Sequence, residues 1–406
     1  MGGRTAGDYP KSLPEFFRRF PDDDACLRYL VETRWPHGFQ CPACGGSDAT
    51  FLTARRLWQC RACRRQTSAT AGTVLHRSHL PLTAWFTAAF LMAGHKPGVS
   101  ALQIQHLLGM ASFQPAWTML QKLRRAMVNP DRSPLSGEIE VDETWVGGKQ
   151  AGLKGGRQRK DRKALLVVVA VERRTDALGR LRLEVIPDAS QATLRDFITR
   201  NVAPGSTIIS DAWTGYGGLA ALDYTHLPLN QSAGKRAGGE GDAVPGVHRV
   251  ISNLKTWLRG THHGVGADHL DAYLDEFVFR FNRRRRPFAG FATLLGLGSA
   301  HEPVPASAIV APFGRAAGAR GRATGQTSCR WASPPPSPDP AVPPDAEPWF
   351  SVEEREHETE AGFIRAVARR VGDALGPHGD QRPLTSRTTT ETIRLDPREA
   401  TDPVGG

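Results

Sequence analysis

The chain has 406 residues, enough for two or three domains that each bury a core, and it carries 52 Lys and Arg against 41 Asp and Glu. The formal charge of +11 and the pI near 9.7 favour a polyanionic partner, since basic side chains bind best where they displace counterions from phosphates; a membrane surface is the alternative. Six cysteines in so long a chain exclude a disulfide scaffold, and the absence of long apolar runs predicts a cytoplasmic protein without a membrane segment or signal peptide.

The first predicted module is a helical leader, residues 1–35. Within residues 12–34 the pattern indicates a short helix, a break at Pro21 and a second helix that begins at the acidic run after it. Cys26 has no partner at metal-binding spacing and is interpreted as a small packed side chain. We expect this leader to support the module that follows.

Two Cys-x-x-Cys pairs predict a zinc ribbon over residues 36–79. The ligands would be Cys41, Cys44, Cys60 and Cys63. Each pair forms a tight turn that points two thiolates at one ion, and Gly45 and Gly46 can adopt the positive backbone angles of such a turn. A redox dithiol pair is the alternative, but the surrounding residues do not indicate a strand-helix redox fold. Five arginines around the pairs are expected to contact phosphate: Arg55, Arg56, Arg61, Arg64 and Arg65.

Three helices are predicted over residues 83–94, 100–108 and 113–127, in a region that spans residues 80–132. Ser100 is the expected N-cap of the second helix and Gly109 its stop. The third helix ends in basic residues that are expected to contact DNA: Lys122, Arg124 and Arg125. This arrangement is typical of a helix-turn-helix, although helical hairpins also occur in enzymes.

From about residue 137 the pattern changes to strands. Three strands, a helix, a strand, a small helix, a strand and a helix predict a ribonuclease-H-like catalytic domain over residues 135–295, and hence a multi-domain α/β chain. In that fold the first and fourth strands are neighbours, so we expect Asp142 and Asp211 to meet. Two close carboxylates repel one another unless a cation lies between them, which predicts a Mg²⁺ site; a solvated edge charge is the alternative.

The segment around Asp142 fits this interpretation. Ile139 and Val141 would place one face of the strand in the core while Asp142 faces the other side. The loop of Gly147 and Gly148 that follows leaves room for a DNA backbone, and Lys149 is expected to contact DNA.

The third metal ligand is expected on the helix near residues 247–260. His248, Lys255 and Arg259 share one face, which predicts His248 as a ligand or proton-handling group, Lys255 as a phosphate contact and Arg259 as a DNA contact. Asn253 lies about 140° from His248 on an ideal helix and could serve only if the helix starts late. Glu276 on the next helix is another candidate. The alternative for the whole face is a solvated basic surface.

The last periodic segment, residues 269–287, predicts a helix with an apolar core stripe. It is followed by an arginine run in which Arg283 and Arg284 are expected to contact phosphate, although such runs are also common on solvated surfaces.

The motifs "CPACGG", "VDETWVGGK", "SDAWTGY", "HRVISNLKTWLRGTHHGV" and "YLDEFVFRFNRR" together resemble bacterial insertion-sequence transposases of the Asp-Asp-Glu class, in the group with an N-terminal zinc ribbon. The resemblance covers roughly residues 12–295. It implies Mg²⁺- or Mn²⁺-dependent cutting at element ends, strand transfer into target DNA, terminal-repeat binding by the N-terminal modules, a homo-oligomer on DNA and association with the nucleoid. Asp142 and Asp211 match the two aspartates, and Lys255 matches the basic residue two turns after the third acid.

The sequence departs from that family at the third acid, where His248 stands in place of a glutamate. Histidine can bind a divalent ion but carries no negative charge, and it suits softer metals than Mg²⁺. Two alternatives therefore stay open: a catalytically impaired, transposase-derived DNA-binding protein, and a zinc-ribbon transcriptional regulator.

Residues 296–406 are rich in Pro, Gly, Ala and Arg without periodicity, which predicts a mostly disordered tail. Cys329 is interpreted as a tail residue, and a short helix is expected near residues 351–375.

Overall fold

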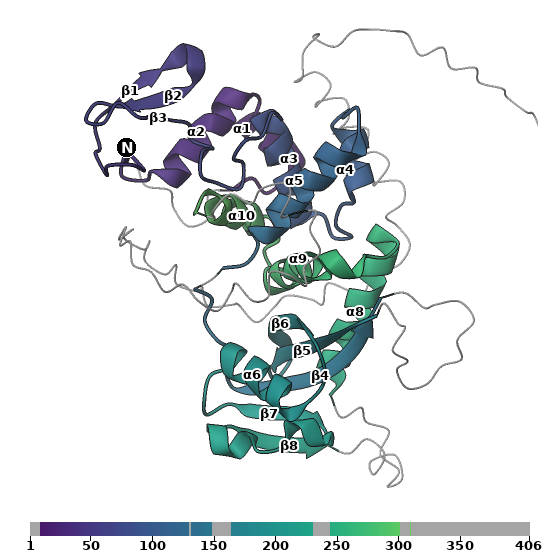
Figure 1. Ribbon diagram of the computed structural model, residues 1–406. Helices are drawn as coiled ribbons and strands as arrows, with labels where there is room; N and C mark the ends of the chain where they lie inside the picture. The colour runs from purple at the N-terminus through teal and green to yellow at the C-terminus, as the bar shows by residue number, and fades with distance from the viewer. Residues whose placement is uncertain (1–8, 130, 148–163, 230–243, 301–308, 310–406) are drawn as a thin grey trace, which may run out of the picture.

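A computed structural model describes residues 9–129, 131–147, 164–229, 244–300 and 309 (Figure 1). The predicted fold class is confirmed: the described chain is a multi-domain α/β protein with a ribbon of clustered cysteines, a helical region and a mixed sheet flanked by helices. Lys149, Cys329 and the helix expected near residues 351–375 lie outside the described residues.

The leader forms α1 (Leu13–Arg19) and α2 (Asp23–Arg34), as expected from its capping residues. The side chain of Ser12 accepts a hydrogen bond from the N–H of Glu15, and Asp22 accepts one from the N–H of Ala25. At the end of α2, the ring of Trp35 packs edge-on against Trp58 of the ribbon. The leader therefore contacts the ribbon directly.

The ribbon is a small antiparallel sheet of β1 (Ala49–Leu52), β2 (Leu57–Cys60) and β3 (Gln66–Thr67), with a 3-10 turn η1 (Thr53–Arg55) between the first two strands. Phe51 and Trp58 are paired across β1 and β2. Their rings lie 4.6 Å apart between centroids, a contact that adds to the stability of a very short hairpin.

The three helices expected after the ribbon are present as α3 (Leu82–Gly94), α4 (Ala101–Leu107) and α5 (Phe113–Arg125). Ser100 caps α4 by accepting a hydrogen bond from the N–H of Gln103. Gly109 has a φ of +60°, which a glycine adopts without strain, and the chain turns there. The predicted helices, cap and stop are thus confirmed.

A further helix, α10 (Ala289–Ala300), packs into the N-terminal core and was not expected from the sequence. The ring of Phe291 lies among aromatic rings of α1, α2 and α3: Phe16, Phe20, Tyr29, Phe86 and Phe90. Figure 1 shows α10 beside α2, which it contacts together with α3, and far from the five-stranded sheet. The helix crosses residue 296, where the tail was expected to begin, because its burial against α3 compensates for its glycines.

The sheet of the second half has the strand order β6-β5-β4-β7-β8. Its strands are β4 (Glu138–Val146), β5 (Leu165–Arg173), β6 (Leu178–Ile186), β7 (Thr207–Asp211) and β8 (Thr225–Leu229). β4, β5 and β6 pair antiparallel, whereas β7 pairs parallel to both β4 and β8. This is the arrangement that places the first and fourth strands side by side, as the ribonuclease-H-like prediction requires.

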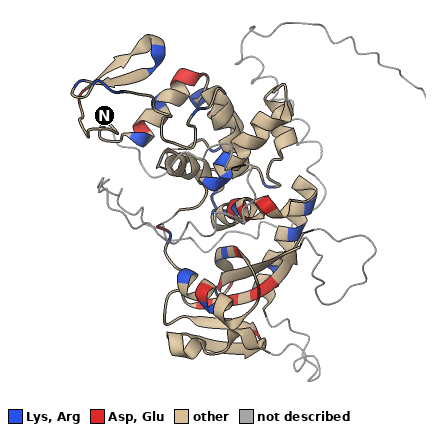
Figure 2. Ribbon diagram, in the orientation of Figure 1, with Lys and Arg blue, Asp and Glu red and all other residues tan. Residues whose placement is uncertain are grey.

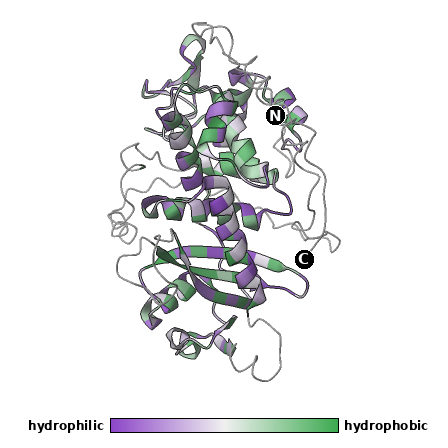
Figure 3. Cartoon of the chain, turned by 90° about the vertical axis from the view of Figure 1, so that its right-hand side faces the viewer, coloured by the Kyte–Doolittle hydropathy of each residue, from purple (hydrophilic) through white to green (hydrophobic). Residues whose placement is uncertain are grey.

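Helices cover both faces of this sheet. One face packs on α8 (Pro245–His262) and α9 (Leu270–Asn282), and the other packs on α6 (Gln191–Asn201) and the 3-10 turns η2 (Thr214–Tyr216) and η3 (Leu219–Leu222). A last 3-10 turn, η4 (Ala267–His269), precedes α9. Figure 3 shows apolar residues along the strands and along the helices of the N-terminal half, in keeping with separate cores.

In the described part of the chain, no helix combines the length and the apolar character needed to cross a membrane.

Candidate active site and metal centre

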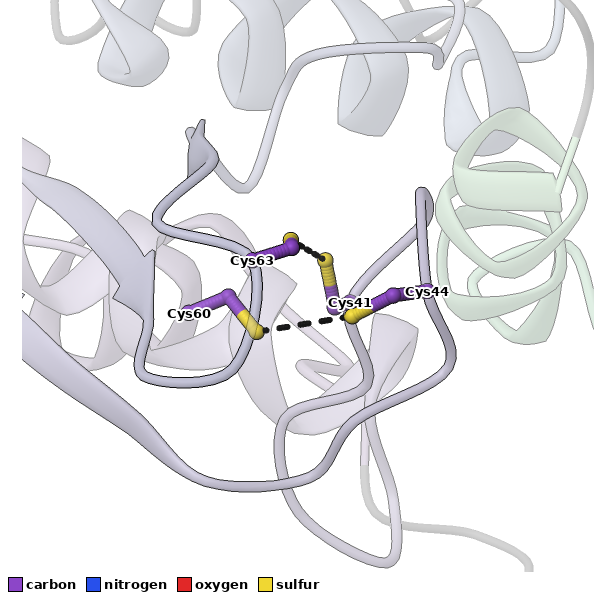
Figure 4. A group of neighbouring side chains, drawn as sticks. All are labelled: Cys41, Cys44, Cys60 and Cys63. Atoms are coloured by element: carbon purple, nitrogen blue, oxygen red, sulfur yellow. Dashed lines mark hydrogen bonds between the residues drawn. The ribbon is translucent and has the colours of Figure 1, made fainter.

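The four predicted cysteines come together at the end of the β1–β2 hairpin opposite η1 (Figure 4). Their sulfur atoms all lie within 4.8 Å of one another, with 3.5 Å between the Sγ atoms of Cys41 and Cys63 and 3.6 Å between those of Cys44 and Cys60. Zinc–sulfur bonds of about 2.3 Å in a tetrahedron require sulfur separations of about 3.8 Å. Donor type and spacing therefore fit a structural zinc ion.

The two cysteine turns have matching main-chain hydrogen bonds. The N–H of Gly45 donates to the carbonyl of Cys41, and the N–H of Arg64 donates to the carbonyl of Cys60. Gly45 has a φ of +73° and Arg64 a φ of +62°, so an arginine occupies the left-handed conformation in the second turn. Gly46 does not adopt a positive φ, contrary to expectation; a Cβ there would lie 3.6 Å from the Sγ of Cys60.

Asp142 lies in the middle of β4, and Asp211 lies at the carboxyl end of β7, the strand that pairs parallel to β4. The pairing of β4 with β7 places Ile139 opposite Ile208 and Glu140 opposite Ile209. Continued by two residues, the same register sets Asp142 opposite Asp211. Side chains two residues apart in a strand share a face, so both aspartates face α8, as Ile209 does.

Helix α8 places His248 against Asp142. The Nε2 atom of His248 lies 3.1 Å from the Oδ2 atom of Asp142, and the two side chains are 37% and 18% exposed. Glu140, two residues before Asp142 on the same face of β4, is buried under this helix. Its Oε2 atom accepts a hydrogen bond from the N–H of Val247 in the first turn of α8. Glu140 thus stabilises the helix end that carries His248.

Negative charge accumulates around Asp142 (Figure 2 shows the acidic residues along β4). Burial raises the pKa of Asp142 above its ordinary value; the N–H of Glu143 and the ring of His248 oppose that shift, whereas the charge of Asp211 adds to it. The charge of Asp211 thus disfavours ionisation of Asp142, and a cation bound near both carboxylates would relieve that repulsion.

Glu143 and Tyr216 form a hydrogen-bonded pair next to this site, which no sequence pattern indicated. Tyr216 is completely buried, and its hydroxyl donates a 2.6 Å hydrogen bond to the Oε1 atom of Glu143. Burial raises the pKa of Glu143 to about 7; the Tyr216 hydrogen bond opposes the shift and the Asp142 and Asp211 charges add to it. Glu143 follows Asp142 and Tyr216 lies in the "SDAWTGY" motif, but nothing in the sequence shows that the two side chains meet.

The residues around Asp142 fit a divalent ion: two carboxylates offer charge and oxygen, and His248 offers one nitrogen. Among the described residues, however, the four cysteines are the one group of three or more metal-ligating side chains gathered within such short distances. A catalytic ion at Asp142 stays a prediction.

Two alternatives for the third ligand do not fit the structure. Asn253 required a late helix start, but α8 begins at Pro245, before His248, so Asn253 faces a different direction. Glu276 is completely buried between α5 and α9, where its Oε2 atom lies 2.7 Å from the Nε atom of Arg124. That pairing excludes Glu276 from the Asp142 site.

The same ion pair corrects the DNA-binding prediction for Arg124, which is only 1% exposed and cannot reach a duplex. Arg284 is half-buried, its guanidinium lies over the ring of Phe281, and it donates to the carbonyls of Leu178 and Gly179. Arg283 lies similarly over Phe279. In the arginine run the exposed members are Arg285 and Arg286, which the prediction did not select.

The other predicted DNA contacts differ in exposure. Lys122 is half-buried and donates to the carbonyl of His76, and Arg125 is also half-buried. Six remaining arginines are exposed: Arg55, Arg56, Arg61, Arg64, Arg65 and Arg259. Arg56 pairs with Asp24 and Arg61 with Asp48, both at the surface. Lys255 is half-buried on α8. For all the basic residues in this paragraph, contact with DNA stays a prediction.

Comparison with known proteins agrees with this geometry. Residues 134–282 match the family described as the ISXO2-like transposase domain, and residues 21–66 match the transposase zinc-ribbon domain. An "Uncharacterized transposase-like protein" of Haemophilus influenzae is 26% identical over 98 residues, which cover 24% of this chain and 77% of that protein. The predicted resemblance to zinc-ribbon transposases of the Asp-Asp-Glu class is confirmed: a segment similar to a transposase zinc ribbon precedes a segment similar to a transposase domain.

Proposed function

We propose that this protein is a DNA transposase that binds the terminal repeats of an insertion element and catalyses metal-dependent strand cleavage and strand transfer. One observation carries the proposal: within the transposase-domain match, His248 contacts Asp142 on the sheet face that Asp211 shares. Three distant segments of the chain thereby supply candidate ligands beside the middle of β4 and the carboxyl end of β7.

Each residue has a proposed role. Asp142, Asp211 and His248 would hold Mg²⁺ or Mn²⁺, which when bound would activate a water or 3′-hydroxyl and stabilise the leaving oxygen of an in-line displacement. Lys255 lies about two turns along α8 from His248, on the same helix face, and would contact a phosphate of the bound strand. Glu140 would keep the first turn of α8, and with it His248, in register with β4.

The zinc ribbon and the helical region would bind double-stranded DNA. The ribbon exposes Arg55, Arg64 and Arg65 around a cysteine cluster that fits zinc, so its charge is presented by a small rigid module. The net charge of +11 supports a phosphate-dominated interaction. Assembly of several copies on the two element ends is part of the proposal.

Cleavage of labelled DNA that carries the element ends, with Mg²⁺ or Mn²⁺, tests the proposal. We expect Asp142→Ala and Asp211→Ala to reduce nicking by at least 10³-fold, as loss of a metal ligand removes the charge stabilisation of the transition state (an order-of-magnitude expectation). Asp176→Ala alters an exposed aspartate in the turn between β5 and β6 and is the matched control. Nicking that survives Asp142→Ala would refute the assignment to this site.

A second function is favoured by the histidine at position 248. A site with two carboxylates and a neutral imidazole neutralises less charge than three carboxylates, which fits a transposase-derived protein that binds element ends without cutting them, or a zinc-ribbon regulator. Binding of terminal-repeat DNA with no nicking in either metal, together with nicking by His248→Glu, would favour this function. The shared sheet face of Asp142 and Asp211 supports the catalytic proposal instead.

A further inference from the structure

The two aspartates lie beyond the backbone ladder that joins their strands. Parallel pairing of β4 with β7 runs from Glu138 and Thr207 to Glu140 and Ile209. Asp142 and Asp211 each follow the last pair by two residues, at the point where β7 ends. Side-chain contacts must therefore help to set the separation of the two carboxylates.

On the opposite face of the sheet, a side-chain hydrogen bond connects β4 to the segment that follows β7. Glu143 follows Asp142 on β4 and, by strand alternation, faces away from α8. The hydroxyl of Tyr216, in η2 just after β7, donates to its Oε1 atom over 2.6 Å. Both partners are withdrawn from solvent and Tyr216 is completely buried, so water competes little for this bond.

The turn between Asp211 and Tyr216 is itself closely packed. The N–H of Trp213 donates to the Oδ1 atom of Asp211, and the indole Nε1 of Trp213 donates to the carbonyl of Ala189. Gly215 lies beneath that ring, where a Cβ would come within 2.5 Å of the indole nitrogen. The carbonyl of Gly217 accepts hydrogen bonds from Arg195 of α6. A shift of Tyr216 would therefore move the segment that orients the Asp211 carboxylate.

We propose that the hydrogen bond between Tyr216 and Glu143 positions Asp142 relative to Asp211 and so determines the affinity of the site for a divalent ion. Tyr216 and Glu143 are positioning residues in this proposal, since neither side chain faces the side of the sheet on which the ion would bind. The inference rests on the proposed function, because it assumes that Asp142 and Asp211 hold the ion.

Tyr224 provides a matched control. It is also buried, and its hydroxyl donates a 3.0 Å hydrogen bond to the carbonyl of Val202, in the same α6-side core as Tyr216. Its partner lies at the end of α6 rather than on a carboxylate-bearing strand. Tyr216→Phe and Tyr224→Phe thus remove the same group from similar surroundings, and they differ in the connection to Asp142.

The test measures Mn²⁺ binding to the zinc-loaded full chain by calorimetry, with melting temperature as a second readout. We expect Tyr224→Phe to bind Mn²⁺ as the unaltered protein does, and Tyr216→Phe to bind at least 10-fold more weakly, the usual effect of losing an outer-shell hydrogen bond (about 10- to 100-fold). Both variants should melt at similar, lower temperatures. Equal Mn²⁺ affinity of the two variants would overturn the inference.

A second pair of variants covers the case in which Tyr216→Phe does not fold. Glu143→Gln keeps an oxygen that can accept the Tyr216 hydrogen bond, whereas Glu143→Ala does not, so we expect the alanine variant to lose the larger share of Mn²⁺ affinity. Equal losses of Mn²⁺ affinity in the two variants would mean that the charge of Glu143, and not its hydrogen bond with Tyr216, affects binding. That result would overturn the inference. Absence of Mn²⁺ binding that depends on Asp142 in the unaltered chain would refute the proposed function itself, a different outcome.

Discussion

Arg124 of α5 and Glu276 of α9 form an ion pair in which both side chains are essentially inaccessible to solvent, 1% and 0% exposed, with 2.7 Å between Nε and Oε2. The pair joins the helical region to the helix that flanks the sheet. Arg280 lies 3.7 Å from the same carboxylate and donates to the carbonyls of His95 and Lys96 after α3. Charged contacts therefore connect the N-terminal helices to α9.

Removal of this carboxylate should strongly destabilise the protein. In Glu276→Gln the guanidinium of Arg124 stays buried without a counter-charge, and we expect a loss of about 3–5 kcal/mol in the free energy of unfolding. Urea denaturation measures the change. Glu184→Gln, which breaks a partly exposed pair with Arg200, is the control and should cost less than about 1 kcal/mol. Similar losses in the free energy of unfolding for the two substitutions would contradict a solvent-excluded ion pair at Glu276.

Half-buried His262 should make folding stability depend on pH. Burial and the nearby charges of Arg124 and Arg280 lower its pKa from 6.5 to about 3, so the folded state keeps it neutral while the unfolded state takes up a proton below pH 6.5. The contribution of neutral His262 to the free energy of unfolding is present above pH 6.5. It is lost as the pH falls toward 3. Between pH 7 and pH 5 the expected loss is about 2 kcal/mol. Denaturation of the protein and of His262→Phe at both pH values measures it; an unchanged pH dependence in the variant would contradict the assignment.

Chelation of zinc should unfold the ribbon alone. Four thiolates around one ion contribute most of the stability of so small a sheet, so we expect a strong chelator to abolish protection from hydrogen exchange in residues 36–70 and to abolish specific DNA binding. Residues in β4 to β8 should keep their protection, which mass spectrometry of exchanged peptides can follow. Loss of protection in both regions at once would argue that they are not separate modules.

Arg64→Gly should increase stability and weaken DNA binding. Arg64 has a φ of +62°, a conformation in which glycine avoids the strain of a Cβ, so we expect a gain of about 0.5–1 kcal/mol in the zinc-loaded protein. Loss of the exposed charge should reduce the slope of log affinity against log salt by about 1. Arg65→Ala removes a neighbouring exposed charge without a positive φ, and should weaken binding with no gain in stability. A salt slope that Arg64→Gly leaves unchanged would exclude a phosphate contact.

Most of the described helices and strands could be predicted because each rests on a local pattern. Strand alternation around Ile139 and the buried run of β5 indicate strands, and Ser100 and Asp22 mark helix starts through hydrogen bonds within one turn. The cysteine ribbon was predictable for the same reason, since each pair forms its own turn. α10 was missed because its glycine-rich sequence lacks such a pattern, and its stability comes from Phe291 packing on distant helices.

The sequence by itself determined where most of the described helices and strands form and that four cysteines share a site, because those features depend on residues close together in the chain. Only the tertiary structure decided which polar side chains meet. It buried Arg124 against Glu276, placed Glu140 under α8, joined Glu143 to Tyr216 and brought His248 to Asp142. Those pairings depend on how helices cross the sheet, and the burial that makes them strong arises only when distant segments pack together.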